Sequence, residues 1–134
     1  MPDFRRVNDH LSVSPQLSVA DVAEAKARGF VTLVNNRPDG EASDQPASAE
    51  IEAAAKAAGL NYIHIPVRGV SPDVAEQTYE AIESSPGPVL AFCRSGTRSI
   101  SCYSLGKHLQ GHDRDELVKA AASAGYDLSN LLPG

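Results

Sequence analysis

Cysteine is scarce in this sequence, which has 2 cysteines, Cys93 and Cys102, among 134 residues. Two thiols are too few for the disulfide framework of a small secreted domain and for a metal site built from four thiolates. The histidines at the most metal-like spacing, His108 and His112, are separated by Gly111, which is expected to end the helix between them. The sequence therefore predicts free thiols in a reducing compartment and neither a metal nor another cofactor.

Long apolar runs and an excess of positive charge are also lacking. No segment approaches the roughly 18 apolar residues that a membrane-spanning helix needs, and residues 1–10 contain no apolar core of a secretion signal. The net charge of -5 disfavours general binding to nucleic acids or to anionic membranes, because both attract basic surfaces. We expect a cytoplasmic protein whose partners are neither nucleic acids nor membranes.

Helix and strand signals alternate along the chain, with no internal repeat and no domain linker. Ser18 and Asp21 form the start signal of a helix that ends at Gly29, and the β-branched segment 30–36 is typical of a strand covered on both faces. This alternation predicts one α/β domain over residues 1–134, with a central, mainly parallel sheet flanked by helices. The other expected elements are a hairpin within residues 1–17, strands at 60–67 and 89–92, helices at 46–59, 71–83, 98–111 and 113–125 (the last opened by a capping box from Asp113 to Glu116), and one helical turn over 127–132.

The segment CRSGTRS, residues 93–99, follows the apolar strand 89–92 and opens a predicted helix. Open α/β sheets bind ligands at this position, and helix N-termini attract anions through their free N–H groups. Small residues allow the backbone to curl into a nest of N–H groups, and Arg98 can bind a tetrahedral oxyanion with its guanidinium. The residues predicted to bind a phosphate, another small oxyanion or a sulfur substrate are those between the cysteine and this arginine: Arg94, Ser95, Gly96 and Thr97.

Cys93 is the predicted nucleophile of this loop. Helix N-termini and neighbouring cations stabilise a thiolate, and a thiolate beneath an anion nest is aimed at the bound atom. Ser99 is expected to donate its hydroxyl to the thiolate and to stabilise it as a leaving group. The structural alternative is that Cys93 is a small buried hydrophobic residue at the end of a strand.

FCRSGTRS resembles the signature loops of the cysteine-dependent phosphatases and of the rhodaneses. Nearly the whole chain resembles the phosphatase-like domain of the beta-lactamase-hydrolase-like proteins, a bacterial family with the fold of tyrosine and dual-specificity phosphatases that is also catalogued with the sulfurtransferases. The resemblance implies a phosphatase that acts through a Cys93 phosphoenzyme, and it suggests a functional link to a metallo-hydrolase domain. The segments that carry it follow one another in order at 13–22, 29–41, 57–67, 87–99 and 124–133.

The spacing of the loop departs from the phosphatase pattern. Tyrosine phosphatases use Cys-x5-Arg, whereas Cys93 and Arg98 give Cys-x4-Arg, which is the spacing of the rhodaneses. A shorter loop makes a tighter nest that suits the terminal sulfur of a persulfide, so a rhodanese-like sulfurtransferase is the alternative function. A non-enzymatic anion binder or thiol redox sensor is a third, because reactive thiols oxidise readily.

A phosphatase of this fold also implies a general acid that protonates the leaving oxygen. In the larger superfamily an aspartate on the loop after the equivalent of strand 60–67 has this role, and the nearest carboxylate here is Asp73. The first turn of a helix is also a place where an aspartate stabilises structure. Asp39 is the second candidate, although its PDG context equally indicates a turn.

Overall fold

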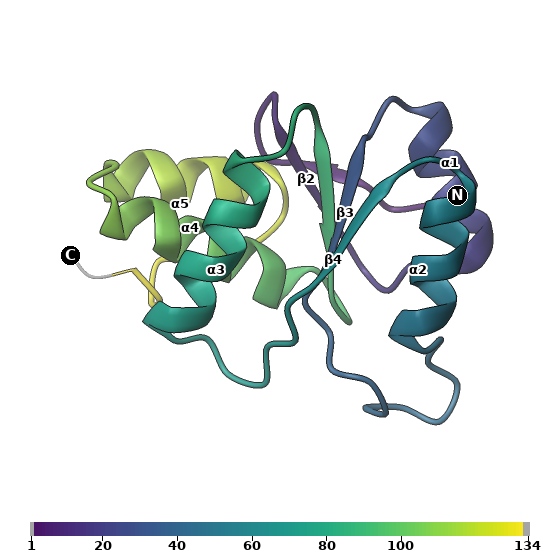
Figure 1. Ribbon diagram of the computed structural model, residues 1–134. Coiled ribbons are helices and arrows are strands. Elements are labelled where there is room, and N and C mark those ends of the chain that lie inside the picture. Colours follow the sequence, from purple (N-terminus) through teal and green to yellow (C-terminus); the bar gives the residue numbers. More distant parts are fainter. Residues whose placement is uncertain (1, 133–134) are drawn as a thin grey trace.

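A five-stranded sheet runs through the middle of the computed structural model, which describes residues 2–132 (Figure 1). The strands are β1 Arg5–Arg6, β2 Leu11–Ser14, β3 Thr32–Asn35, β4 Asn61–His64 and β5 Val89–Phe92, and the helices are α1 Val19–Ala27, α2 Ser48–Ala57, α3 Pro72–Glu83, α4 Thr97–Leu109 and α5 Arg114–Ser123. The strand order is β1-β2-β5-β3-β4. β1 and β2 pair antiparallel as the predicted N-terminal hairpin, and all other neighbours pair parallel. The predicted mixed α/β fold with a mainly parallel sheet is therefore confirmed.

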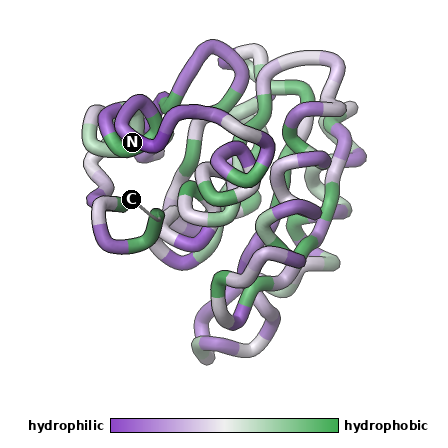
Figure 2. Tube along the Cα trace, turned by 90° about the vertical axis from the view of Figure 1, so that its left-hand side faces the viewer, coloured by the Kyte–Doolittle hydropathy of each residue, from purple (hydrophilic) through white to green (hydrophobic). Residues whose placement is uncertain are grey.

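The inner strands are buried on both faces because successive side chains point to opposite sides of the sheet. In β5, Val89 and Ala91 join the core beneath α3, α4 and α5, whereas Leu90 and Phe92 join the core beneath α1 and α2. Hydrophobic and hydrophilic positions are interspersed along the helices (Figure 2), and their buried residues join these two cores. This arrangement explains why β5 is a continuous apolar run.

Several boundaries follow from local signals, and other elements are shorter than predicted. Ser18 and Asp21 form the complete capping box of α1, and in α5 the Asp113 side chain accepts a hydrogen bond from the Glu116 N–H. The segment 127–132 contains the predicted single turn, in which the N–H groups of Leu131 and Leu132 donate to the carbonyl of Leu128, and β4 is shorter than the predicted strand 60–67. Within residues 2–132, no helix combines the length and the apolar composition that crossing a bilayer requires.

The four parallel strands end at the same edge of the sheet. β3 leads into α2 on one face, while its neighbour β5 leads into α4 on the other face (Figure 1). Loops that leave adjacent strands in opposite directions open a crevice, and open α/β sheets bind ligands in this crevice. The fold therefore places the segment that follows β5 at the position where a ligand site is expected.

Candidate active site

Cys93 directly follows β5, the strand that lies between β2 and β3. Its side chain is 1% exposed, and its Sγ accepts a hydrogen bond of 3.2 Å from the N–H of Gly96. Helix α4 begins at Thr97, one residue later. The thiol therefore lies beneath the first turn of α4, where the positive end of the helix dipole favours an anion.

The loop between β5 and α4 presents its backbone N–H groups. Those of Arg94, Ser95 and Arg98 make no hydrogen bond within the part of the chain that the structure describes. The hydroxyls of Ser95 and Thr97 lie 2.9 Å apart, and both residues are exposed. Successive free amides in a tight loop are a feature of anion-binding concavities.

Gly96 is required by the shape of this loop. Its φ is +93°, and a Cβ at this position would lie 2.2 Å from the hydroxyl oxygen of Tyr126. The Tyr126 hydroxyl donates a hydrogen bond of 2.8 Å to the carbonyl of Ser95, and the Gln16 N–H donates one of 3.2 Å to the carbonyl of Arg94. The C-terminal segment and the residues after β2 thus hold the loop through two of its carbonyl groups.

The Arg98 guanidinium is fixed by a carboxylate from the loop after β3. Nη1 and Nη2 of Arg98 each donate a hydrogen bond of 2.8 Å to Glu41, and Nη1 also donates one of 2.8 Å to the carbonyl of Val67. Arg37, whose side chain is 5% exposed, donates a further bond of 3.0 Å to Glu41. The hydrogen bonds from Arg98 and then from Arg37 lower the pKa of Glu41 to about 2, and Glu41 followed by the nearby Cys93 raises the pKa of Arg98. Both members of this pair are therefore charged at neutral pH.

Ser99 contacts a buried asparagine and not Cys93, which corrects the predicted hydrogen bond to the thiolate. The Asn36 Nδ2 donates to the carbonyl of Ile65 and to the Thr78 hydroxyl, both at 3.1 Å. A carbonyl oxygen can only accept, so this contact fixes the amide orientation of Asn36 and turns its Oδ1 toward Ser99. The Ser99 hydroxyl, which has a single O–H, donates its hydrogen bond to this Oδ1 at 2.8 Å. The donor to the Cys93 sulfur is the Gly96 N–H instead.

The structure does not bring Asp73 to the cysteine. Asp73 is exposed in the first turn of α3 and forms no hydrogen bond or ion pair through its side chain within residues 2–132. Two residues later, the Ala75 carbonyl oxygen lies 2.6 Å from the place that a Cβ would take at Gly106. Gly106 lies more than two helical turns, about 13 Å, beyond the start of α4. The first turn of α3 therefore packs against the far half of α4.

Asp39 has a structural contact that accounts for its position. Its Oδ1 accepts a hydrogen bond of 2.8 Å from the N–H of Ser48, the first residue of α2. The residue before it, Ala47, has no side-chain oxygen with which to cap this helix. Asp39 therefore caps α2 from a distance, as its turn context allows.

A family model described as "Beta-lactamase hydrolase-like protein, phosphatase-like domain" matches residues 3–110. The chain belongs to this family. A beta-lactamase hydrolase-like protein of Agrobacterium fabrum is 37% identical over 128 residues, which cover 92% of this chain and 29% of that relative. The chain thus spans less than a third of the length of the curated relative.

Solved structures share the fold of this family member. A candidate phosphatase from Neisseria meningitidis has a TM-score of 0.85 and 32% sequence identity, with 97% of this chain and 94% of that chain covered. TpbA of P. aeruginosa, solved in complex with pTyr, has a TM-score of 0.66 and 17% identity over 96% of this chain and 77% of that chain. At that identity the likeness concerns the fold alone. Together, the family and these structures establish a phosphatase-like fold.

Several residues of this phosphatase-like site were not identified from the sequence. Asn36 and Arg37 carry a signal that could have found them, because polar residues directly after a buried strand lie at the ligand-binding edge. Glu41 lies in the same loop but has only a turn context, and Tyr126 follows a helix with no local mark of function. Their roles depend on contacts with the distant loop 93–98.

Proposed function

We propose that this chain is a cysteine-dependent phosphatase that hydrolyses phosphomonoesters through a covalent phosphate on Cys93. The observation that carries this proposal is the position of the Cys93 sulfur beneath the first turn of α4, in one loop with free amides and with Arg98. Membership of the phosphatase-like family supports it. The likeness in fold to TpbA, which was solved with pTyr, supports a phosphate ester as ligand.

The proposed reaction has two displacements at phosphorus. The Cys93 thiolate attacks the phosphorus, an S–P bond forms, the P–O ester bond breaks, and the released oxygen takes up a proton. Water then attacks the same phosphorus, the S–P bond breaks, and inorganic phosphate leaves with the thiolate restored. Arg98 and the loop N–H groups bind the non-bridging oxygens in both displacements, where preorganised donors stabilise the charge.

The role of Asp73 as general acid is a separate proposal from the sequence, and it requires the first turn of α3 to approach Cys93 when substrate binds. Loss of a general acid slows the release of a strongly basic alkoxide much more than the release of 4-nitrophenolate. Asp73→Asn should therefore reduce kcat for an alkyl phosphate at least tenfold more than kcat for 4-nitrophenyl phosphate. Equal effects on the two substrates would remove Asp73 from the mechanism.

A rhodanese-like sulfurtransferase is the second candidate, favoured by the Cys-x4-Arg spacing. In that reaction the Cys93 thiolate takes the outer sulfur of thiosulfate, releasing sulfite, and passes it to cyanide as thiocyanate. The tight contact of the Gly96 N–H with Sγ suits a small terminal sulfur. This candidate predicts thiocyanate formation and a mass increase of one sulfur atom on Cys93.

The deciding experiment measures phosphate release from 4-nitrophenyl phosphate and thiocyanate formation from thiosulfate and cyanide, side by side, with the same purified protein. Cys93→Ser tests the nucleophile, and Cys102→Ser is the matched control because Cys102 is a buried thiol of α4. We expect phosphate release by the wild type and by Cys102→Ser, and none by Cys93→Ser. If the wild type and Cys93→Ser release phosphate at the same rate, the proposed function is wrong.

A further inference from the structure

Arginines of this acidic chain are almost all paired with carboxylates. Within residues 2–132, ion pairs join an aspartate or a glutamate to Arg5, Arg6, Arg28, Arg37, Arg98 and Arg114. The remaining arginines are Arg68 and Arg94, and neither guanidinium makes an ion pair or a hydrogen bond to the described residues. In a chain with a net charge of -5, carboxylates are plentiful, so two arginines without one call for an explanation.

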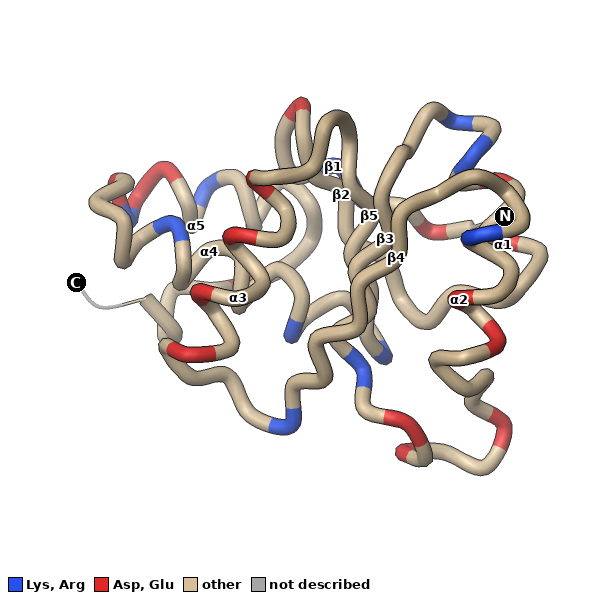
Figure 3. Tube along the Cα trace, viewed as in Figure 1, with Lys and Arg blue, Asp and Glu red and all other residues tan. Residues whose placement is uncertain are grey.

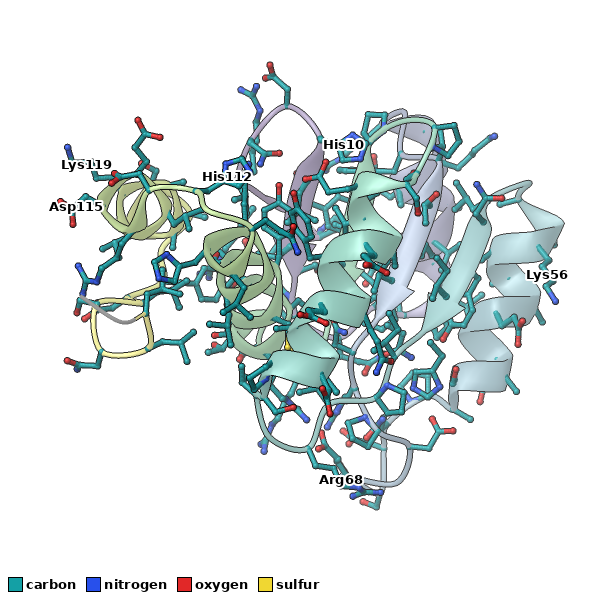
Figure 4. The ribbon with its side chains drawn as sticks, turned by 60° about the vertical axis from the view of Figure 1, so that its left-hand side comes forward. His10, Lys56, Arg68, His112, Asp115 and Lys119 are labelled. Atoms are coloured by element: carbon teal, nitrogen blue, oxygen red, sulfur yellow. The ribbon has the colours of Figure 1, made fainter. Side chains whose placement is uncertain are left out.

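One unpaired arginine lies in the Cys93 loop, and the other follows a residue that is hydrogen-bonded to Arg98. Arg94 directly follows Cys93, and its carbonyl is held by the Gln16 N–H at 3.2 Å. Arg68 directly follows Val67, whose carbonyl accepts a hydrogen bond of 2.8 Å from Arg98. Both side chains belong to exposed residues. Basic positions gather below the carboxyl ends of the strands in Figure 3, and Arg68 lies at the same lower edge in Figure 4, away from Lys119.

The phosphoryl group itself does not need these two arginines. Arg98 and the free amides of the loop supply donors for its oxygens, and Arg37 is engaged by Glu41 and Gln16. A guanidinium offers five N–H donors in a planar fork that matches phosphate and carboxylate groups. Unpaired guanidiniums that flank an anion site repel each other and Arg98, and a further anionic group bound between them relieves this repulsion.

We propose that Arg68 and Arg94 form a second anion subsite, and that the substrate carries at least one additional phosphate close to the phosphate that is transferred to Cys93. The preferred substrate class is therefore a polyphosphorylated small molecule, and not a phosphate ester whose remaining part is neutral. This inference rests on the proposed phosphatase function, because it concerns a second phosphate on the substrate whose first phosphate reacts with Cys93. It also explains why the two arginines that have no carboxylate partner among the described residues lie next to residues of the Cys93 site.

Equilibrium binding to the Cys93→Ser protein tests the subsite without turnover. Titration calorimetry gives the dissociation constants of orthophosphate and tripolyphosphate at one ionic strength and pH, and the ratio of the two constants is compared between variants. Arg68→Gln and Arg94→Gln each remove one positive charge from the subsite. Lys119→Gln removes one from an exposed position of α5 and is the matched control.

We expect the Cys93→Ser protein to bind tripolyphosphate at least tenfold more tightly than orthophosphate. Each arginine variant should reduce this ratio at least threefold, and Lys119→Gln should leave it unchanged. A ratio near one before the arginines are changed overturns the subsite, and so does an equal loss in Lys119→Gln, which would reveal a general charge effect. The proposed function is tested separately: it is overturned if the protein shows no phosphate release that depends on Cys93. The two proposals therefore fail in different measurements.

Discussion

Glu41 and Arg98 form a two-pronged ion pair in which both Nη atoms of the arginine donate at 2.8 Å to the carboxylate. Nη1 also donates a hydrogen bond to the Val67 carbonyl. Glu41 and Val67 together therefore fix the orientation of the guanidinium. The donors that remain are available to the Cys93 loop. Glu41 thus orients the arginine that is proposed to bind the phosphate, although no local sequence signal marks it.

Glu41→Gln should reduce kcat/KM for 4-nitrophenyl phosphate by about 10- to 100-fold, because a misplaced binding group costs catalysis on this scale. The amide can accept one hydrogen bond from Arg98 but offers its NH2 group to the other donor, so the two-pronged contact is lost. Asp44→Asn is the matched control, since Asp44 is exposed in the same loop and forms no ion pair within residues 2–132. Unchanged or increased kcat/KM in Glu41→Gln would contradict the orienting role.

The same carboxylate should make stability depend on pH in acid. Its pKa falls from the usual value of 4.5 to about 2 in the folded chain, with Arg98 as the main cause. The unfolded state therefore binds a proton more readily than the folded state, so this stabilisation is fully present above about pH 4.5 and is lost as the pH falls toward 2. We expect Glu41→Gln to lower the unfolding free energy by about 1–3 kcal/mol at pH 7.

Thermal or urea unfolding between pH 7 and pH 2.5 measures this difference between the wild type and Glu41→Gln. The two curves should approach each other as the pH falls through the range from 4.5 to 2. A difference that stays constant down to pH 2.5 would mean that the carboxylate charge contributes nothing to the fold.

The hydrogen bond between Ser99 and Asn36 should contribute to stability, because both side chains are buried and 0% exposed. Ser99→Ala leaves the Asn36 Oδ1 without its donor, which is expected to cost about 1–3 kcal/mol. Asn36→Ala should cost more, since it also removes the contacts with Ile65 and Thr78. In a double-mutant cycle the two changes should couple by at least about 0.5 kcal/mol. If the two changes in unfolding free energy are strictly additive in urea unfolding, this hydrogen bond contributes nothing to stability.

The sequence was most informative where short-range chemistry decides the structure. The bounds of β5 and the start of α1 follow from an apolar run and from the Ser18 capping box, and the tight loop before α4 follows from the small residues after Cys93. Contacts across the fold could not be predicted in this way. Glu41 meets Arg98 across 57 positions and Asn36 meets Ser99 across 63, and such pairs depend on which strands become neighbours. The predicted hydrogen bond from Ser99 to Cys93 is absent for this reason. The Ser99 hydroxyl donates instead to the buried side-chain amide of Asn36, which follows β3.

Gly96 offers a test of the loop geometry that separates two causes of strain. Gly96→Ala must place a side chain at a φ of +93° and must also displace the Tyr126 hydroxyl, which would lie 2.2 Å from the new Cβ. Gly29 has the same φ of +93°, but nothing lies within 4 Å of its Cβ position. Gly29→Ala therefore measures the backbone cost alone, which is about 1–2 kcal/mol.

Gly96→Ala should lose at least about 1 kcal/mol more than Gly29→Ala in urea unfolding, and it should also lose phosphatase activity, which Gly29→Ala keeps. Gly96→Ala combined with Tyr126→Phe removes the closest atom but leaves the Tyr126 ring carbon at 3.1 Å and the left-handed backbone. The double variant should therefore regain part of the stability and little of the activity. If Gly96→Ala and Gly29→Ala lose the same unfolding free energy, the Tyr126 side chain can move away from the new Cβ at little cost. Tyr126 would then not determine the shape of the loop between β5 and α4.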